Sequence, residues 1–312
     1  QRLNMVTDPH RMSIGKVLRI PSRLLKSKPI DASLVAYRGT ISVTSNTRAL
    51  TPVVGMGATE GMQLATGADG FLTFALSNGS RITLPSRSRV SVRSLRQFLL
   101  GNATDVDIMV DQGRAETNVT PLPNPASRYR LRTPTAVSAV RGTTFRVGYV
   151  EGSSDSLTEV VEGKVDVGIG GKPASLIQAG SGAIVRKDGG VAIEQLLPAI
   201  ALLSPGKVQK DVDVSLTLDA AESARQYHTQ LSSDAGFVDL VAEAYTTTPQ
   251  VGFSGIGDGT YFVRAAAVSA NGLEGLTQTY SMKRRLSTLG GAIEKSDDGR
   301  FAFKWFGDGK GE

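Results

Sequence analysis

The sequence contains no cysteine, which excludes structural disulfides, thiolate zinc sites and cysteine nucleophiles. It has only two histidines, His10 and His228, and neither has the spacing of a metal ligand or the neighbours of a Ser-His-Asp triad. Aromatic residues make up 6% of the chain and Trp305 is its one tryptophan, so platforms for stacking sugars or bases are scarce. These shortages argue against metal, thiol and triad enzymes.

Long apolar runs are also missing. The longest, Leu196 to Leu203, is interrupted by Pro198 and is much shorter than the ~20 residues of a spanning helix. We therefore expect a protein that is not integral to a membrane. The chain opens on Gln1-Arg2-Leu3 with no signal peptide, which indicates a fragment or a processed product.

The positive charge is mild and scattered. The formal net charge is +6, and the densest basic stretch, Arg81 to Arg96, alternates with period two as the solvated face of a strand does. No aromatic residues are interleaved with these arginines, so the sequence predicts no nucleic-acid partner.

Short alternating runs broken by glycine dominate the chain, which has 35 glycines. Phe71 to Leu76 and Arg81 to Leu84 flank Asn78-Gly79, which predicts a hairpin with a tight turn. One short segment, Val92 to Leu100, is compatible with a helix. The pattern predicts an all-β fold, and the length predicts two or three domains.

Composition divides the chain into five expected segments. Residues 1–30 are short and basic, 31–192 alternate as strands, and 193–210 form a linker with Pro198 and Pro205. Residues 211–288 hold several short strands with turn signals between them, which predicts a small β-sandwich. The alternation of Phe301, Phe303 and Trp305 predicts the start of a second sandwich over 289–312.

Several patterns resemble functional sites but favour a structural interpretation. The glycines of 55–57 and 168–171 are followed by no helical pattern, so they indicate hairpin turns instead of phosphate loops. The aspartates of 105–107 and 297–299 are too few for a calcium cage. Nothing places Glu159 and Glu162 across a cleft as a hydrolytic pair. The sequence therefore predicts no catalytic, cofactor-binding or metal-binding residue and no cofactor.

The most distinctive short motif is Arg141-Gly142-Thr143, which Arg38-Gly39-Thr40 repeats inside another apolar run. One interpretation is a recognition loop. The favoured one is structural: Gly142 permits a bulge or a close backbone approach, while Val140 and Phe145 are buried.

A longer stretch around this motif carries a family resemblance. Residues 133–147 (TPTAVSAVRGTTFRV), followed by 160–167 (VVEGKVDV) and 176–180 (LIQAG), resemble the signature of FecR-like domains. The turns at 67–70, 78–80 and 111–113 match that family in order. The resemblance implies an all-β domain, solenoid- or sandwich-like, without enzymatic activity. Such domains occur in periplasmic parts of transmembrane signalling proteins and in other envelope proteins.

Two further resemblances flank this stretch. Residues 4–21 resemble the second half of a LysM domain, a family that binds N-acetylglucosamine-containing glycans such as peptidoglycan. Residues 211–285 resemble a fibronectin type III-like module, with Tyr261-x-Val263-Arg264 on its penultimate core strand. This order of modules implies a periplasmic or envelope-associated protein of a Gram-negative bacterium.

The leading hypothesis is a non-enzymatic scaffold or signalling protein. It would be tethered to peptidoglycan through a complete LysM domain and would present β modules to an envelope protein partner. A carbohydrate-binding accessory protein is the alternative, which aromatic platforms would favour. A direct sigma-factor regulator is a third possibility, which would need a cytoplasmic segment and a membrane helix.

Overall fold

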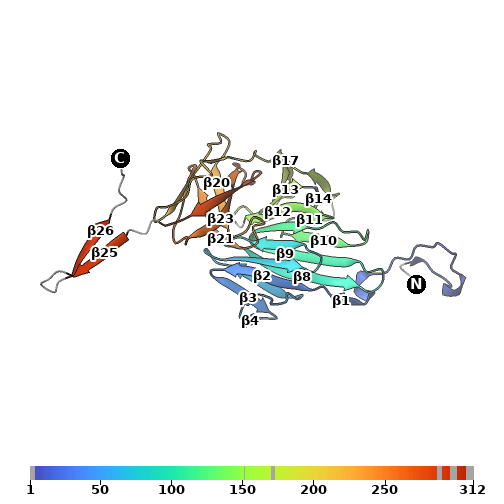
Figure 1. The fold of residues 1–312 in the computed structure, drawn as a ribbon. Coiled ribbons are helices and arrows are strands. Elements are labelled where there is room, and N and C mark those ends of the chain that lie inside the picture. The colour runs from blue at the N-terminus through green and yellow to red at the C-terminus, as the bar shows by residue number, and fades with distance from the viewer. Residues whose placement is uncertain (1–3, 151, 170–172, 287–289, 296–300, 307–312) are drawn as a thin grey trace. The chain divides into compact units, whose positions relative to one another are not determined.

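The computed structural model describes residues 4–150, 152–169, 173–286, 290–295 and 301–306. The chain forms two compact units, which we describe separately: residues 1–196 with Asn271–Leu273, and residues 197–270 with 274–312 (Figure 1). Apart from two short 3₁₀ turns, η2 (Pro9–Arg11) and η3 (Ser22–Leu24), every described element is a strand. The predicted all-β, multi-domain fold is confirmed. In the part of the chain described, no helix has the length and apolar character needed to span a bilayer.

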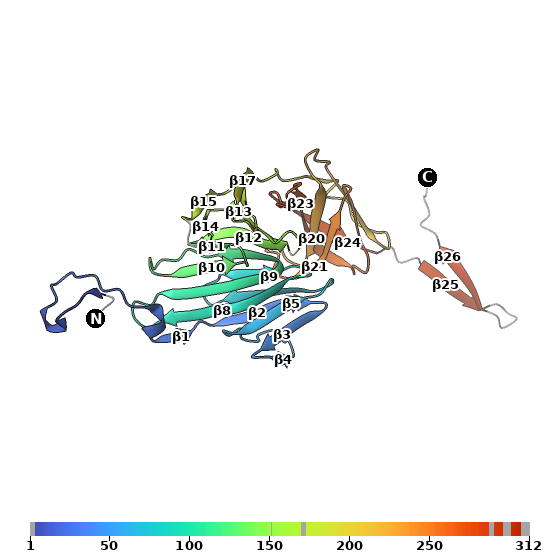
Figure 2. The same ribbon diagram turned by 180° about the vertical axis from the view of Figure 1, so that it is seen from behind.

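The first unit contains two sheets that share one strand. Sheet A has the order β4 (Arg48–Leu50), β3 (Ile41–Ser45), β5 (Met62–Thr66), β8 (Arg89–Phe98), β9 (Thr104–Val119), β10 (Arg128–Arg132), β11 (Val137–Val140), β14 (Lys164–Gly168) and β15 (Ser175–Gln178). The short β1 (Ser27–Pro29) pairs with the end of β8. Figure 2 shows this order as a ladder of strands from β4 to β15.

Sheet B has the order β2 (Ala32–Arg38), β6 (Phe71–Leu76), β7 (Arg81–Leu84), β9, β12 (Thr143–Val150), β13 (Asp155–Glu162), β16 (Ser181–Val185) and β17 (Val191–Gln195). The first half of β9 pairs in sheet A and its second half in sheet B. The β9–β10 pair is parallel and the other pairs are antiparallel. The long β9 therefore joins the two sheets into one unit.

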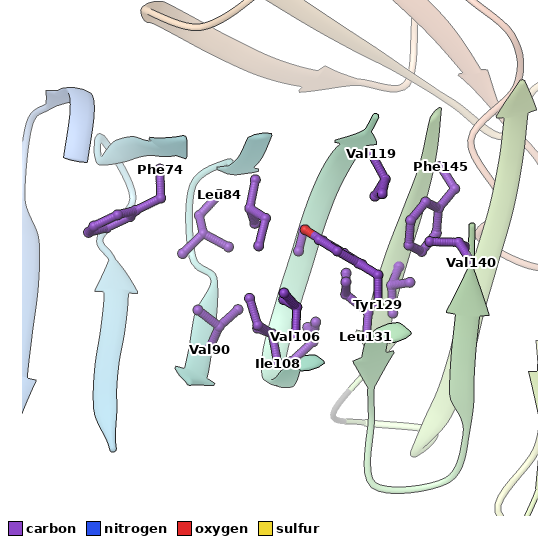
Figure 3. Packing of buried hydrophobic residues seen from close by; sticks show 14 of the residues in the cluster. Phe74, Leu84, Val90, Val106, Ile108, Val119, Tyr129, Leu131, Val140 and Phe145 are labelled. Atoms are coloured by element: carbon purple, nitrogen blue, oxygen red, sulfur yellow. The ribbon is translucent and has the colours of Figure 1, made fainter. Parts of the chain in front are cut away.

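The core of the first unit is made by the inward side chains of both sheets. Alternation along each strand sends every second residue inward, as at Tyr129 and Leu131 on β10, which are at most 1% exposed. Figure 3 shows Phe74, Val106 and Phe145, from three different strands, directed into the same interior. The segment Val92–Leu100, which is compatible with a helix by sequence, belongs mostly to β8, because Val90, Val92 and Leu95 pack into this core. Burial of a continuous apolar face overrides the local pattern here.

The second unit is a two-sheet sandwich. One sheet has the order β18 (Leu202–Leu203), β19 (Val214–Leu218), β22 (Gln250–Phe253); the other has the order β21 (Leu240–Thr246), β20 (Gln226–Ser232), β23 (Gly259–Val268), β24 (Gln278–Arg284). Leu216, Leu231 and Val263 belong to a core to which both sheets contribute. β25 (Gly290–Lys295) and β26 (Phe301–Phe306) pair with each other as a hairpin.

The segment 193–210, which the sequence predicts to be a linker, contains strand residues. It holds the end of β17 and all of β18, and Ile200 and Leu202 are buried in the second core. Pro198 and Pro205 lie outside both strands, so they interrupt the segment without preventing either pairing.

Residues 4–26 form no packed core of their own. Most of their apolar side chains are exposed, among them Ile14 and Val17. Asn4 is hydrogen-bonded to the backbone of Arg19. The LysM resemblance of 4–21 therefore has no folded domain behind it within these residues.

Candidate functional site

The two histidines lie in different units and have different surroundings. His10 lies in the exposed η2 turn, where the Asp8 carboxylate accepts its backbone N–H. His228, on β20 of the second unit, is 5% exposed and lies between two buried glutamates. Its Nε2 is 2.5 Å from Glu243 Oε1 and its Nδ1 is 3.1 Å from Glu274 Oε1. Its ring stacks on Tyr245, with the ring centroids 4.2 Å apart.

This cluster holds His228 as a buried cation. Burial alone would lower the pKa of His228, but the charges and hydrogen bonds of Glu274 and Glu243 outweigh burial and raise it to about 9. Both ring nitrogens face a carboxylate, which suits the doubly protonated imidazolium. A buried cation with both nitrogens occupied stabilises the sandwich and is unsuited to accept a proton from a substrate.

Glu159 and Glu162, the carboxylates of β13, do not face each other. Glu159 is fully buried and pairs with Arg114, at 2.8 Å, and with Arg146, at 3.4 Å. Glu162 is exposed and accepts a hydrogen bond from Thr144. The pair has no geometry for hydrolysis, and Glu159 is the centre of a buried ion-pair cluster in sheet B.

The other candidate motifs have structural positions. Residues 55–57 run beside β2, and Gly168 ends β14. Residues 170–171 and 297–299 lie outside the described residues. Asp107 pairs with Arg130 and Arg132, and Asp105 pairs with Arg130. Within the described ranges, no cluster of three or more acidic or histidine side chains is arranged to hold a metal ion.

The Arg141-Gly142-Thr143 turn between β11 and β12 has the structural role that the sequence favours. Gly142 has φ +131°, and a Cβ at this position would lie 2.8 Å from Pro121 Cα. Val140 and Phe145 are buried, and the register of β12 shifts between Thr144 and Phe145. The close backbone approach predicted for this glycine is confirmed.

The side chains on either side of Gly142 fasten two neighbouring segments. The Arg141 guanidinium donates to the carbonyls of Leu122, Asn124 and Pro125, in the connection between β9 and β10. The Thr143 hydroxyl donates to the Lys164 carbonyl at 3.0 Å. The earlier copy of the motif, at 38–40, also joins two strands. Gly39 has φ +61°, and a Cβ at this position would lie 2.0 Å from the Asp69 carbonyl oxygen.

A groove of about 630 Å³ opens beside Arg141 on the outer face of sheet A. Arg130, Ala139, Asp166 and Leu176 are successive cross-strand partners on β10, β11, β14 and β15. The small side chain of Ala139 leaves the hollow, and Arg128, Arg141 and Lys164 line it. This groove combines side chains from separate segments, so no local motif in the sequence predicts it.

The edges of the two sheets differ in how they are protected. The outer side of β2 is covered, because Leu34 N–H donates to the Met56 carbonyl and Ala58 N–H to the Ala32 carbonyl, both at 2.8 Å. At the edges of sheet A, β4 has three residues and β15 has four. β17, the other edge of sheet B, has five residues and pairs only with β16 among the described strands. Long uncovered edges are rare because they invite pairing with another chain.

The free side of β17 is defined by its pairing with β16. Leu196 N–H donates to the Gly180 carbonyl, so alternation directs the backbone groups of Val191, Ile193 and Gln195 away from β16. Val191 and Ile193 are also 41% and 55% exposed. The sequence prediction divided this strand between a domain ending at 192 and a linker. In the sequence, the period-two alternation of residues 191–195 was the signal that could have predicted β17 as one strand.

Comparison with protein families finds a match to part of the first unit. Residues 62–166 match the family model described as FecR protein. The first unit contains a FecR-like domain. The match spans β5 to most of β14 and includes the Arg141-Gly142-Thr143 turn, while β15 to β17 follow it in sequence.

Comparison with solved structures finds low similarity. Two structures of a candidate anti-sigma factor from Parabacteroides distasonis align with TM-scores of 0.36 and 0.35 at 19% and 17% identity, and each covers 43% of this chain. The aligned part spans 59% of that protein's length. The FN1–FN3 domains of chicken CNTN1 align over 84% of this chain and 97% of their own, at 9% identity and a TM-score of 0.23. No curated protein matches the sequence.

Proposed function

We propose that this protein is a non-enzymatic component of the bacterial envelope whose FecR-like unit binds a partner protein by accepting a strand at β17. The observation that carries the proposal is the uncovered backbone of Val191, Ile193 and Gln195 beside exposed β-branched side chains. An added strand satisfies such donors and acceptors and gains affinity from main-chain hydrogen bonds. The FecR-like match supports a signalling or regulatory role in the envelope.

The flanking segments extend this proposal. We assign 1–30 to the second half of a LysM domain that tethers the complete protein to peptidoglycan, and 211–288 to a fibronectin type III-like module. The exposed apolar side chains of Ile14 and Val17 support the first assignment, because a missing half domain would cover them. The three-plus-four-stranded sandwich of the second unit supports the other.

Photo-crosslinking tests the edge. A photoreactive benzoylphenylalanine replaces the exposed Val191, and adducts formed in cells of the source organism are identified by mass spectrometry. Ile193→Pro removes one edge N–H and should abolish the adduct, because proline cannot donate to an added strand. Ile193→Thr is the matched control: it keeps the N–H and the β-branched shape, and it should retain the adduct.

Two outcomes would overturn the edge proposal. One is an adduct of equal yield in the Ile193→Pro variant. The other is a partner that crosslinks to a photoreactive group at Gln178, on β15, and never at position 191. Retention on purified sacculi tests the peptidoglycan assignment separately. We expect the present chain to bind weakly and a chain with its natural upstream residues to bind well; equal retention would place glycan binding elsewhere.

A further inference from the structure

The groove on the outer face of sheet A is lined mainly by cationic side chains. Arg128, Arg130, Arg141 and Lys164 contribute positive charge, and Asp166 is the one acid among the lining residues. Arg130 is already neutralised, since its guanidinium pairs with Asp105 at 2.6 Å and with Asp107 at 3.1 Å.

The remaining three cations have no acidic partner within the described part of the chain. Arg128, Arg141 and Lys164 are exposed, and none of them forms an ion pair there. Against the single charge of Asp166 they leave the groove with an excess of positive charge. A concave surface of one sign attracts ligands of the opposite sign and raises their association rate.

One of these cations is held in place before any ligand arrives. Three backbone carbonyls of the β9–β10 connection accept hydrogen bonds from Arg141 and neutralise none of its charge. A fixed guanidinium loses little side-chain entropy when it binds a carboxylate. Arg141 therefore has a structural role and also presents a preorganised charge at the rim.

The apolar parts of the groove indicate the class of ligand. Tyr129 contributes no stacking surface, because its side chain is 1% exposed, and the lining contains no other aromatic residue. Leu176 is 52% exposed on the opposite side from Arg128 and offers an apolar contact. Sugars and bases usually bind on aromatic faces. Cations beside one aliphatic contact suit a peptide with carboxylates near an aliphatic residue.

We infer that this groove binds an extended acidic peptide segment of a partner protein. Its aspartate or glutamate carboxylates pair with Arg128, Arg141 and Lys164, and an aliphatic side chain packs on Leu176. Arg141 and Lys164 lie close together because Val140 pairs with Val165 and because Thr143, two residues after Arg141, donates to the Lys164 carbonyl. The inference does not depend on strand addition at β17, which involves different residues.

Fluorescence anisotropy with the purified full chain tests the inference. The probes are a short labelled peptide of Asp, Glu and Ser around one Leu, the same peptide with Asn and Gln in place of the acids, and a labelled uronic-acid oligosaccharide. We expect the acidic peptide to bind and the other two to bind at least about tenfold more weakly, with affinity that falls as salt rises.

Charge-reversed variants locate the binding. Arg128→Glu with Lys164→Glu should weaken the acidic peptide about 30-fold, since two exposed attractions become repulsions. Arg89→Glu with Arg93→Glu makes the same change in net charge at exposed positions on β8 and should leave affinity within a factor of about three. A thermal melt of each variant shows that it is folded.

Three results would overturn the inference. Equal binding of the amide peptide would exclude charge recognition, and preferential binding of the oligosaccharide would assign the groove to glycan. Equal weakening by both double variants would show non-specific attraction to a basic protein. The variant Ile193→Pro should bind the peptide normally, so failure of the β17 proposal and failure of this one give different results.

Discussion

The buried cation at His228 makes a measurable prediction for stability against pH. Its pKa is about 9 in the folded protein against 6.5 as the ordinary value, and each pKa unit corresponds to about 1.4 kcal/mol. The shift therefore contributes on the order of 3 kcal/mol to the second unit. Because the folded pKa is the higher one, the contribution is complete below pH 6.5 and is lost as pH rises through about 9.

Two assays measure the pKa of His228 and the dependence of stability on pH. Since the chain has only two histidines, the variant His10→Asn leaves one imidazole signal, and its NMR titration gives the pKa of His228 directly. Urea unfolding of the full chain between pH 6.5 and 9, followed by a probe of the second unit, gives the change in free energy. We expect a midpoint near 9 and a loss of about 3 kcal/mol across that range.

Matched variants separate this group from others that titrate in the same range. Glu243→Gln removes one carboxylate and should lower both the midpoint and the pH dependence. His228→Gln should remove the imidazole's share of the pH dependence and destabilise the unit at pH 6.5. A His228 midpoint at or below 6.5, or equal stability of the parent chain at pH 6.5 and 9, would refute the reasoning.

Three further substitutions test single structural contacts, and in each case thermal and urea unfolding are the measurements. Gly142→Val should lower the free energy of unfolding by about 3 kcal/mol, because a β-branched residue resists φ +131° and its Cβ would approach Pro121. A folded variant of parental stability would contradict this. Glu159→Gln should cost about 3 to 5 kcal/mol, because it removes the fully buried negative charge that pairs with Arg114 and Arg146. The exposed Glu162→Gln should cost little. Arg284→Met should lower the free energy of unfolding by about 3 kcal/mol, because the buried guanidinium donates hydrogen bonds to the carbonyls of residues 211, 212 and 256 and methionine donates none. An unchanged unfolding midpoint would show that these carbonyls have other hydrogen-bond partners.

Local pattern was enough to predict the fold class. Period-two alternation and the Asn78-Gly79 turn predict strands from nearest-neighbour chemistry alone, and β6 and β7 form the hairpin expected. The role of Gly142 was also predictable, because a glycine between two buried apolar runs usually marks a positive φ or a close approach. The resemblance of the first unit to FecR-like domains was also predictable, because a contiguous motif carries it, and residues 62–166 match that family.

Tertiary structure alone decided the surfaces on which the proposals depend. The groove brings together Arg128, Lys164 and Leu176 from three different strands and Arg141 from a turn. The charge balance there depends on which arginines reach Asp105 and Asp107. Likewise, β17 has an open edge because no other described strand pairs with its far side, which is a property of the whole sheet. Alternation determines which face of a strand is apolar, but long-range pairing determines its neighbours, and only the neighbours decide what is left exposed.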